Sequence, residues 1–436
     1  MLFSSLFAKT AEYEKLAHAL SAPGACALFG LPGSGRAMVY AALAKETGRF
    51  LCIVTPGEAE ATRFAGDLNA LGIPTAVFPA RDYVLRPIEG TAREYEYRRL
   101  SVLGDIVGGR LQAVCVPDEG LTQYTTPRAE FCNNTRTLHP GDTVPRTELT
   151  ALLYNAGYAR RAQVDGPGQF SIRGDIVDLY APDMKLPVRM EFWGDEIDTM
   201  HTFDLATQRR EDPIEKIYVS PAREVLFGSP AEAAELLRDF IKKFRGKKRT
   251  ALEACLATEL AQLDGGALPV NMDKYLAVRY PQPATLLDYF DDPLLVLEEP
   301  ASLREAERAT TYRRGEEISA LLQDGVLAAG LDNLYAENGY LWAQAANHRT
   351  ICAENFARSM PDIPLKDIVN APAHTLPAWG GEVTSLLEDL QPLCNGGAAV
   401  TVLAGTQRAA AGLAADLRTK GLLVTTDPAA APGAGL

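Results

Sequence analysis

The chain of 436 residues lacks several features that would assign its class directly. No apolar run approaches the roughly 18 residues of a membrane-spanning helix, so we expect no membrane partner. Met1 to Lys9 lack a basic segment followed by a signal-type apolar stretch. The seven Cys are scattered without a C-x-x-C pair, and the five His are isolated. These absences argue against a disulfide framework or a metal site and favour a cytoplasmic protein with reduced thiols.

An excess of basic residues is also lacking. The 43 Lys and Arg residues are outnumbered by 56 Asp and Glu, which gives a net charge of −13. Proteins whose main task is to bind phosphate backbones usually have a basic surface. The one dense basic run, Lys242 to Arg249, is therefore interpreted as a solvated helix end and loop, with a local nucleic-acid patch as the alternative.

A glycine-rich loop near the N-terminus has the outline of a phosphate-binding loop. The pattern G-x-x-x-x-G-K-[ST] needs glycines that let N–H groups cradle phosphate, a Lys that reaches the phosphates and a hydroxyl that holds magnesium. Here the Lys position is Arg36 and the hydroxyl position is Ala37. Ala offers no oxygen to a metal, so we expect a degenerate loop without catalysis. Its residues are Gly30, Gly33, Gly35, Arg36 and Ala37.

The order of apolar runs predicts an α/β protein with inserted parts. Strand and helix patterns alternate between residues 26 and 117, which favours a parallel sheet in a P-loop (RecA-like) domain. Short alternating strands follow from about Arg146 and favour a small α+β domain with an antiparallel sheet. Near residues 398–404 a further strand is expected before a helix. The predicted domains are residues 1–125 and 220–345 for the parallel-sheet domain, 126–219 for the inserted domain, and 346–436 for a small α/β domain with a structureless tail.

Three segments of the inserted part, followed by Phe203-Asp204, carry a specific resemblance. They read Gly-Tyr-Ala-Arg at 157–160, Pro-Gly-Gln-Phe-Ser-Ile-Arg-Gly-Asp-Ile-Val-Asp at 167–178, and Pro-Val-Arg-Met-Glu-Phe-Trp-Gly-Asp-Glu-Ile at 187–197. Together they resemble the N-terminal, UvrB-like module of the bacterial transcription-repair coupling factor. The resemblance covers about residues 16–299 and, more weakly, the region from Asn370 onward.

The chain departs from UvrB itself in ways that match the inactive module of the coupling factor. Residues 78–87 run almost directly into a helix, which leaves no room for the DNA-threading hairpin of UvrB. The second acidic motif reads Glu298-Glu299 in place of Asp-Glu. The resemblance implies a fragment that is not an enzyme and holds no cofactor. ATP, magnesium, RNA polymerase and double-stranded DNA would then be handled by motor and interaction domains that lie outside these residues.

The resemblance also implies a partner, the damage-recognition ATPase UvrA. In the family, UvrA is contacted by positions that correspond to Arg173, Arg189 and Trp193, where the family usually has Phe in place of Trp193. Arg160 is a further candidate. By the period-two rule Ser171 and Arg173 face outward, as do Arg189, Glu191 and Trp193. The same surface is expected to be masked by another domain of the intact protein.

Other interpretations of these residues remain open. Arg173 and Arg189 can instead pair with Glu191 or Asp178 across the sheet, and Trp193 can cover a sheet edge. Arg36 and Glu299 can retain nucleotide binding or hydrolysis. Trp193 and the two Arg side chains can also bind single-stranded DNA by stacking and backbone contacts, although the acidic net charge argues against this.

Overall fold

A computed structural model describes residues 10–87, 93–361, 363–373, 382–398, 400, 402 and 406–426. Its largest element is a seven-stranded sheet with the strand order β15-β1-β14-β13-β2-β4-β3, in which every neighbouring pair is parallel. The strands are β1 (Gly24–Phe29), β2 (Leu51–Thr55), β3 (Thr75–Val77), β4 (Ala113–Pro117), β13 (Leu294–Glu298), β14 (Arg349–Glu354) and β15 (Leu365–Asn370). Strands β1, β2, β4 and β13 are buried along their whole length, as their apolar runs predict.

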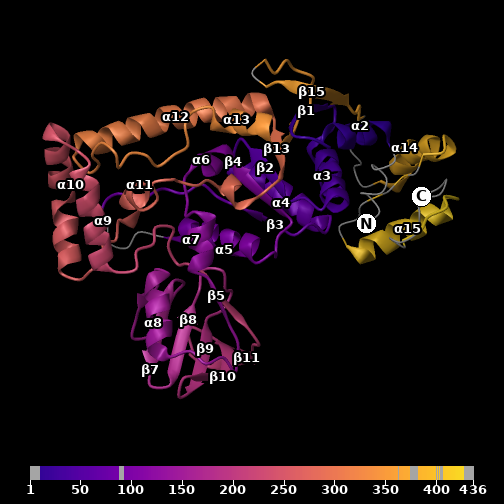
Figure 1. The fold of residues 1–436 in the computed structure, drawn as a ribbon. Helices are drawn as coiled ribbons and strands as arrows, with labels where there is room; N and C mark the ends of the chain where they lie inside the picture. Colours follow the sequence, from indigo (N-terminus) through magenta and orange to yellow (C-terminus); the bar gives the residue numbers. More distant parts are fainter. Residues whose placement is uncertain are drawn as a thin grey trace.

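Helices cover both faces of this sheet (Figure 1). One face packs against α2 (Ala11–Ala19), α3 (Gly33–Thr47) and α4 (Glu58–Ala70). The other packs against α5 (Glu94–Val107), α6 (Asp118–Thr122), α7 (Arg128–Asn133), α12 (Pro300–Gln323) and α13 (Tyr340–Asn347). The prediction of an α/β fold with a parallel sheet is therefore confirmed.

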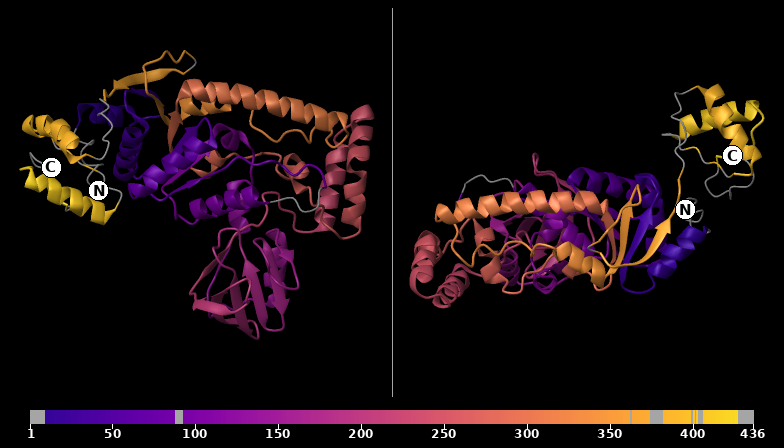
Figure 2. Two further views of the ribbon diagram at one scale, coloured as in Figure 1. Left: turned by 180° about the vertical axis from the view of Figure 1, so that it is seen from behind. Right: turned by 90° about the horizontal axis from the view of Figure 1, so that it is seen from above.

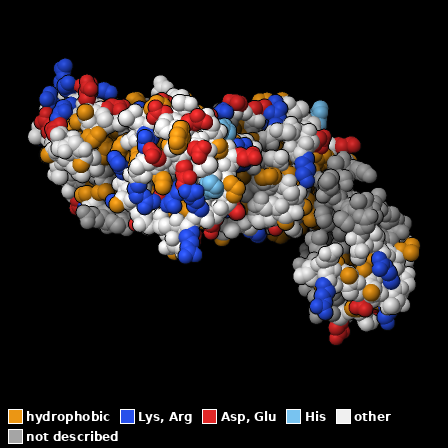
Figure 3. Space-filling model, turned by 90° about the horizontal axis from the view of Figure 1, so that it is seen from below, with side chains coloured by type: hydrophobic (Ala, Val, Ile, Leu, Met, Phe, Trp, Pro, Cys, Tyr) orange, Lys and Arg blue, Asp and Glu red, His pale blue; other side chains and the backbone are white. Residues whose placement is uncertain are grey.

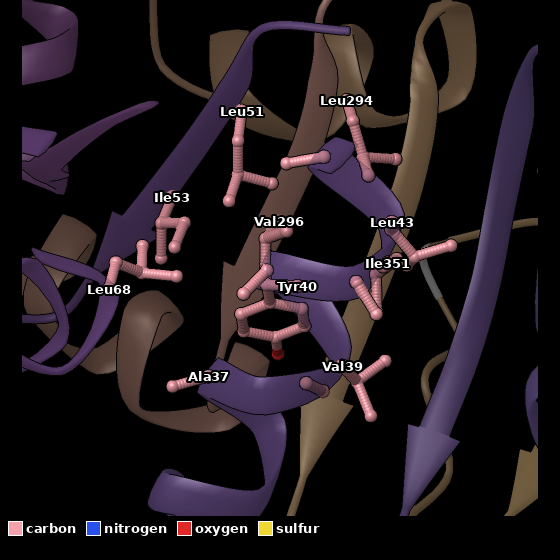
Figure 4. Close-up of a cluster of buried hydrophobic side chains, with 14 of the residues drawn as sticks. Ala37, Val39, Tyr40, Leu43, Leu51, Ile53, Leu68, Leu294, Val296 and Ile351 are labelled. Carbon is pink, nitrogen blue, oxygen red and sulfur yellow. The ribbon is translucent and has the colours of Figure 1, made fainter. Parts of the chain in front are cut away.

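The core beneath α3 places a polar group at the carboxyl ends of the strands. Figure 4 shows the ring of Tyr40 among the apolar side chains of the sheet, with its hydroxyl directed away from Leu51 and Leu294. Those two residues begin their strands, so the hydroxyl lies towards the opposite ends, where β13 finishes at Glu298. This arrangement brings α3 and the end of β13 together at the degenerate phosphate loop.

Between β4 and β13 the chain leaves the parallel sheet and builds an antiparallel domain, which projects below that sheet in Figure 1. Its six-stranded sheet has the order β11-β10-β9-β8-β7-β6 and is antiparallel apart from the β6–β7 pair. The elements are β6 (Ala159–Arg160), β7 (Gln169–Arg173), β8 (Ile176–Tyr180), β9 (Val188–Trp193), β10 (Glu196–Phe203), β11 (Arg210–Pro213) and α8 (Arg146–Asn155). The entering and leaving strands, β5 (Arg136–Leu138) and β12 (Ile217–Val219), pair with each other.

The returning chain first forms a helical unit at one end of the molecule, which Figures 1 and 2 show from opposite sides. It contains α9 (Pro230–Lys242), α10 (Gly246–Asp264), α11 (Leu276–Arg279) and a short 3-10 helix at Met272–Tyr275. A second 3-10 helix, Leu286–Tyr289, packs instead in the core of the parallel sheet. A buried ion cluster ties this unit to the rest, since Arg81 pairs with Asp273 and Glu224, and Arg99 also pairs with Glu224. Within the described residues no helix is long and apolar enough to cross a membrane.

The expected small α/β domain at residues 346–436 needs correction at its start. β14 and β15 belong to the large sheet, because they supply the two parallel neighbours that β1 hydrogen-bonds. Beyond them, α14 (Val383–Asn395) and α15 (Gln407–Thr419) share a small apolar cluster. The strand predicted near residues 398–404 and the tail from residue 427 lie mostly or wholly outside the described residues.

Candidate protein-interaction site

One face of the antiparallel sheet packs on α8, and the other carries the predicted site. Strand alternation sends Phe170, Met190 and Phe192 into the core beneath α8. The cross-strand register then aligns Ser171, Asp178 and Arg189 in one row of the outer face. Trp193 lies on the same strand and the same face as Arg189, four residues further along.

Asp178 is the centre of this outer face. Its side chain has no exposed surface, although it points away from the apolar core. The Nε and Nη2 atoms of Arg189 donate to its two carboxylate oxygens at 2.7 and 2.9 Å, and Nη2 of Arg173 donates at 2.6 Å. A buried carboxylate is stable only when it is paired and hydrogen-bonded, and here two guanidinium groups provide both.

The Arg189 side chain is largely buried, although it lies on the outer face of the sheet. Only 11% of its side chain is exposed. Beyond Asp178, its Nη1 donates to the carbonyl of Gln208 at 3.2 Å, and its guanidinium lies 4.7 Å from the ring centre of Phe203. The hydrogen bonds to Asp178 raise the pKa of Arg189 above its ordinary value. The residue thus faces outward as predicted, but its donors are used inside the domain.

Arg173 and Trp193, in contrast, are open to solvent. The Arg173 side chain is 45% exposed despite its bond to Asp178, and Trp193 is 83% exposed. Both precede turns, at Gly174 and Gly194, that lie at the same end of the sheet. This end therefore offers a cation and a large aromatic ring, the combination found at the centres of protein interfaces.

The remaining outward residues differ from the prediction in part. Ser171 is buried, and its hydroxyl donates to the carbonyl of Ala162 at 2.9 Å. Glu191 pairs with Arg210 from the edge strand β11. Arg160 is exposed on β6, but it is in register with the core-facing Phe170, so it belongs to the other side of the sheet.

The degenerate phosphate loop and the degenerate acidic motif do meet in the fold. Arg36, which is buried, donates through Nη1 to Glu299 at 2.7 Å and lies 3.3 Å from Glu298. The Tyr40 hydroxyl donates to Glu298 at 2.5 Å. Ala37 is fully buried in the core. The loop's own cation is thus paired with the two carboxyl groups at the end of β13, Glu298 and Glu299.

The loop glycines are held close to neighbouring chain. Gly30 has φ of 92°, and a Cβ there would lie 2.7 Å from the carbonyl oxygen of Ala371. Gly33 begins α3, where a Cβ would lie 3.2 Å from the guanidinium of Arg63. Gly35 follows in the first turn of the same helix. Of the three, Gly30 is therefore the one whose backbone conformation and close backbone neighbour require glycine.

Burial shifts the pKa values of the groups that surround Arg36. Burial raises the pKa of Glu298 to about 7, although Arg36 and the Tyr40 hydroxyl oppose the shift. Burial also raises the pKa of Tyr40, with Glu298 adding to the effect. Glu299 has φ of 50°, a left-handed conformation that is costly for a residue with a side chain. Among the described residues, no group of three or more His, Cys, Asp or Glu could hold a metal ion.

The basic run at residues 242–249 lies where α9 passes into α10. Part of its charge is paired locally, since Lys242 bonds Asp239 and Arg249 bonds Glu253. Figure 3 shows acidic and basic side chains interspersed on the face seen from below.

Comparison with known proteins places the inserted domain in a described family. Residues 137–225 match the UvrB interaction domain, and this range contains the antiparallel sheet and α8. The chain is 26% identical to the transcription-repair-coupling factor of Bacillus subtilis (strain 168), over 84% of this chain and 32% of that protein. The chain is related to the transcription-repair-coupling factors.

Two further relatives support this relationship. The transcription-repair-coupling factor of Staphylococcus aureus (strain MRSA252) is 24% identical over 68% of this chain and 26% of its own length. That of Staphylococcus epidermidis (strain ATCC 12228 / FDA PCI 1200) is 23% identical over 87% of this chain and 33% of its own length. The chain thus spans between about a quarter and a third of the length of the coupling factors that it matches.

The sequence pattern does not single out Asp178, Gln208 and Phe203 as residues of the site. Strand alternation makes Asp178 one possible partner of the two Arg residues, and in the structure its carboxylate bonds both of them. A signal was present, because a carboxylate inside the apolar strand Ile-Val-Asp-Leu-Tyr requires a cation nearby. The contacts of Gln208 and Phe203 depend on a turn between β10 and β11 that the sequence pattern does not place.

Proposed function

We propose that the antiparallel domain binds UvrA, and that the chain recruits nucleotide excision repair to stalled transcription without catalysis of its own. The observation that carries this proposal is the overlap of two findings on one domain. The UvrB interaction domain match covers residues 137–225, and the exposed pair Arg173 and Trp193 lies within it. RNA polymerase and double-stranded DNA would be bound by other parts of a longer protein.

The chemistry of the exposed pair suits such a partner. Arg and Trp are enriched among residues whose truncation costs an interface most, and both sit on a rigid sheet rather than on a loop. Trp193 has little contact with its own domain, so a partner pocket would remove most of its surface from water. A partner that presents an apolar pocket beside an acidic group would fit this end of the sheet.

Calorimetric titration with the cognate UvrA tests the proposal. Arg173→Ala and Trp193→Ala should each weaken binding by roughly 2 kcal/mol or more, about 30-fold in Kd. Tyr312→Ala is the matched control, since Tyr312 is an aromatic side chain that is 73% exposed on α12, outside the domain. Absence of binding by the unaltered chain, or equal losses in all three variants, would contradict the proposal.

The alternative of single-stranded DNA binding has less support. It needs free cations beside an aromatic ring, whereas Arg189 is bonded to Asp178 and Arg210 to Glu191. The row around Trp193 therefore carries little net positive charge. A steep fall of oligonucleotide affinity with salt would be the result that favours this alternative.

A further inference from the structure

We propose that Asp178 is the positioning residue of this face, and that Arg189 acts as its counter-ion rather than as a contact to the partner. Arg173 would then be the cation that touches UvrA, held in place by the buried carboxylate. This inference deepens the proposed function and rests on it. It also changes the expectation for Arg189, which the family resemblance assigned to the interface itself.

Arg189 and Arg173 both bond the carboxylate of Asp178, and we call this three-residue arrangement the clamp. Its Oδ1 accepts from Nε of Arg189 at 2.7 Å, while its Oδ2 accepts from Nη2 of Arg189 at 2.9 Å and from Nη2 of Arg173 at 2.6 Å. The carboxylate is completely buried. Loss of its charge would leave Arg189 buried without its main partner and would release Arg173 from a fixed direction.

Arg189 has little left to offer a partner. Its Nε, Nη1 and Nη2 atoms all donate within the domain, to Asp178 and to the carbonyl of Gln208. Gln208 itself has φ of 58°, so the turn adopts a costly backbone conformation where it presents this carbonyl. The ring of Phe203 covers one side of the guanidinium. These contacts hold Arg189 within the domain, where it can orient Asp178 but has no donor directed at a partner.

Arg173 is arranged in the opposite way. It spends Nη2 on Asp178, while Nε and Nη1 make no hydrogen bond within the described part of the chain. A guanidinium fixed at one corner presents its remaining donors in a defined plane, which suits a carboxylate of the partner. Less side-chain entropy is then lost on binding than for a freely rotating Arg.

A double-mutant cycle on UvrA binding separates positioning from direct contact. Asp178→Asn should weaken binding by at least about tenfold, and should weaken it no further once Arg173→Ala is present. Asp175→Asn is the control, because Asp175 is an exposed Asp in the same hairpin that pairs only with Arg146 among the described residues. Additive losses from Asp178→Asn and Arg173→Ala, or full binding by Asp178→Asn, would overturn the inference.

A milder variant covers the case in which Asp178→Asn fails to fold. Arg189→Lys keeps the charge but cannot bond both carboxylate oxygens in the same plane. It should weaken binding in the unaltered chain and have no effect in the Arg173→Ala background. An equal loss in both backgrounds would mean that Arg189 touches UvrA directly and would refute the positioning role.

A measurement without UvrA separates this inference from the proposed function. The Nε–Hε signal of Arg189 in nuclear magnetic resonance spectra should be protected from solvent exchange, and Asp178→Asn should remove that protection. Fast exchange in the unaltered chain would contradict the clamp. If protection is found but no UvrA binds, the clamp stands and the proposed partner is wrong. If UvrA binds and the cycle is additive, the partner stands and the positioning role is wrong.

Discussion

At the scale of single residues, two buried carboxylates bond Arg side chains that the sequence motifs suggest as ligand contacts. Asp178 draws two Arg side chains together on the antiparallel sheet. Glu298 lies beneath the phosphate loop with Arg36 and Tyr40. In both places the cost of burying charge is offset by close pairing, and the enclosed cations Arg189 and Arg36 become unavailable for other ligands.

Glu298 makes stability depend on pH. Because its pKa is raised to about 7 from an ordinary 4.5, the folded state holds a proton that the unfolded state releases. Stability contributed by this group is therefore full below the unfolded pKa and is lost as pH rises towards 7. We compare the unfolding free energy of Glu298→Gln with that of the unaltered chain. The difference should shift in favour of the variant by about 2 to 3 kcal/mol as the pH rises from about 5 to about 8.

Chemical denaturation at several pH values measures this difference. Glu299→Gln is the matched control, since it removes the neighbouring carboxylate, whose side chain is 33% exposed, and leaves the buried one in place. A Glu298→Gln difference that does not change with pH would show that the buried carboxylate keeps an ordinary pKa.

At the scale of elements, the hairpin of β7 and β8 depends on one glycine. Gly174 has φ of 62°, and a Cβ added there would meet nothing within 4 Å. The cost of Gly174→Ala is therefore the backbone conformation alone, and we expect a loss of about 1 to 2 kcal/mol in unfolding free energy. UvrA affinity should also fall, because Arg173 immediately precedes this turn.

Gly66→Ala is the control for this substitution. Gly66 lies exposed in α4, and a Cβ there also meets nothing within 4 Å. It has an ordinary helical backbone, so Ala should stabilise the chain by up to about 1 kcal/mol. Equal effects of the two substitutions in denaturant unfolding would show that the turn does not need its left-handed conformation.

The elements were predictable to different degrees. The buried runs of β1, β2 and β13 and the alternation in β7 to β10 are visible in the sequence because each is a simple period. β14 was missed, because Arg349–Glu354 has a short apolar centre in a less regular region. Its place becomes clear only when β1 and β13 are seen to need a common neighbour.

At the scale of the whole molecule, nucleotide should not stabilise the chain. Arg36 is already paired with Glu298 and Glu299, and Ala37 has no hydroxyl for magnesium. A nucleotide present at 100 times its Kd would raise the unfolding free energy by about 2.7 kcal/mol. We expect ATP with magnesium to leave the thermal midpoint unchanged, with magnesium alone measured in parallel. A midpoint that rises with nucleotide concentration would contradict this expectation.

The fold also explains why the candidate site can be tested apart from the phosphate loop. β5 and β12 join the antiparallel domain to the rest of the molecule as a single pair of strands. The domain has its own apolar core, formed by α8 and the inner face of the sheet. Substitutions at Arg173 or Trp193 change exposed side chains, so they should leave the parallel sheet intact.

The sequence alone determined the α/β class, the degenerate loop and the resemblance that names UvrA as the expected partner. These depend on residue types and on local spacing, which a linear chain displays directly. Only the tertiary structure decided that Arg173 is open while Arg189 is enclosed, although both alternate outward on their strands. The reason is that exposure depends on Asp178, Gln208 and Phe203, which come from other strands and turns. Periodicity gives the face of a strand on which a side chain lies, but not what the rest of the chain lays over it.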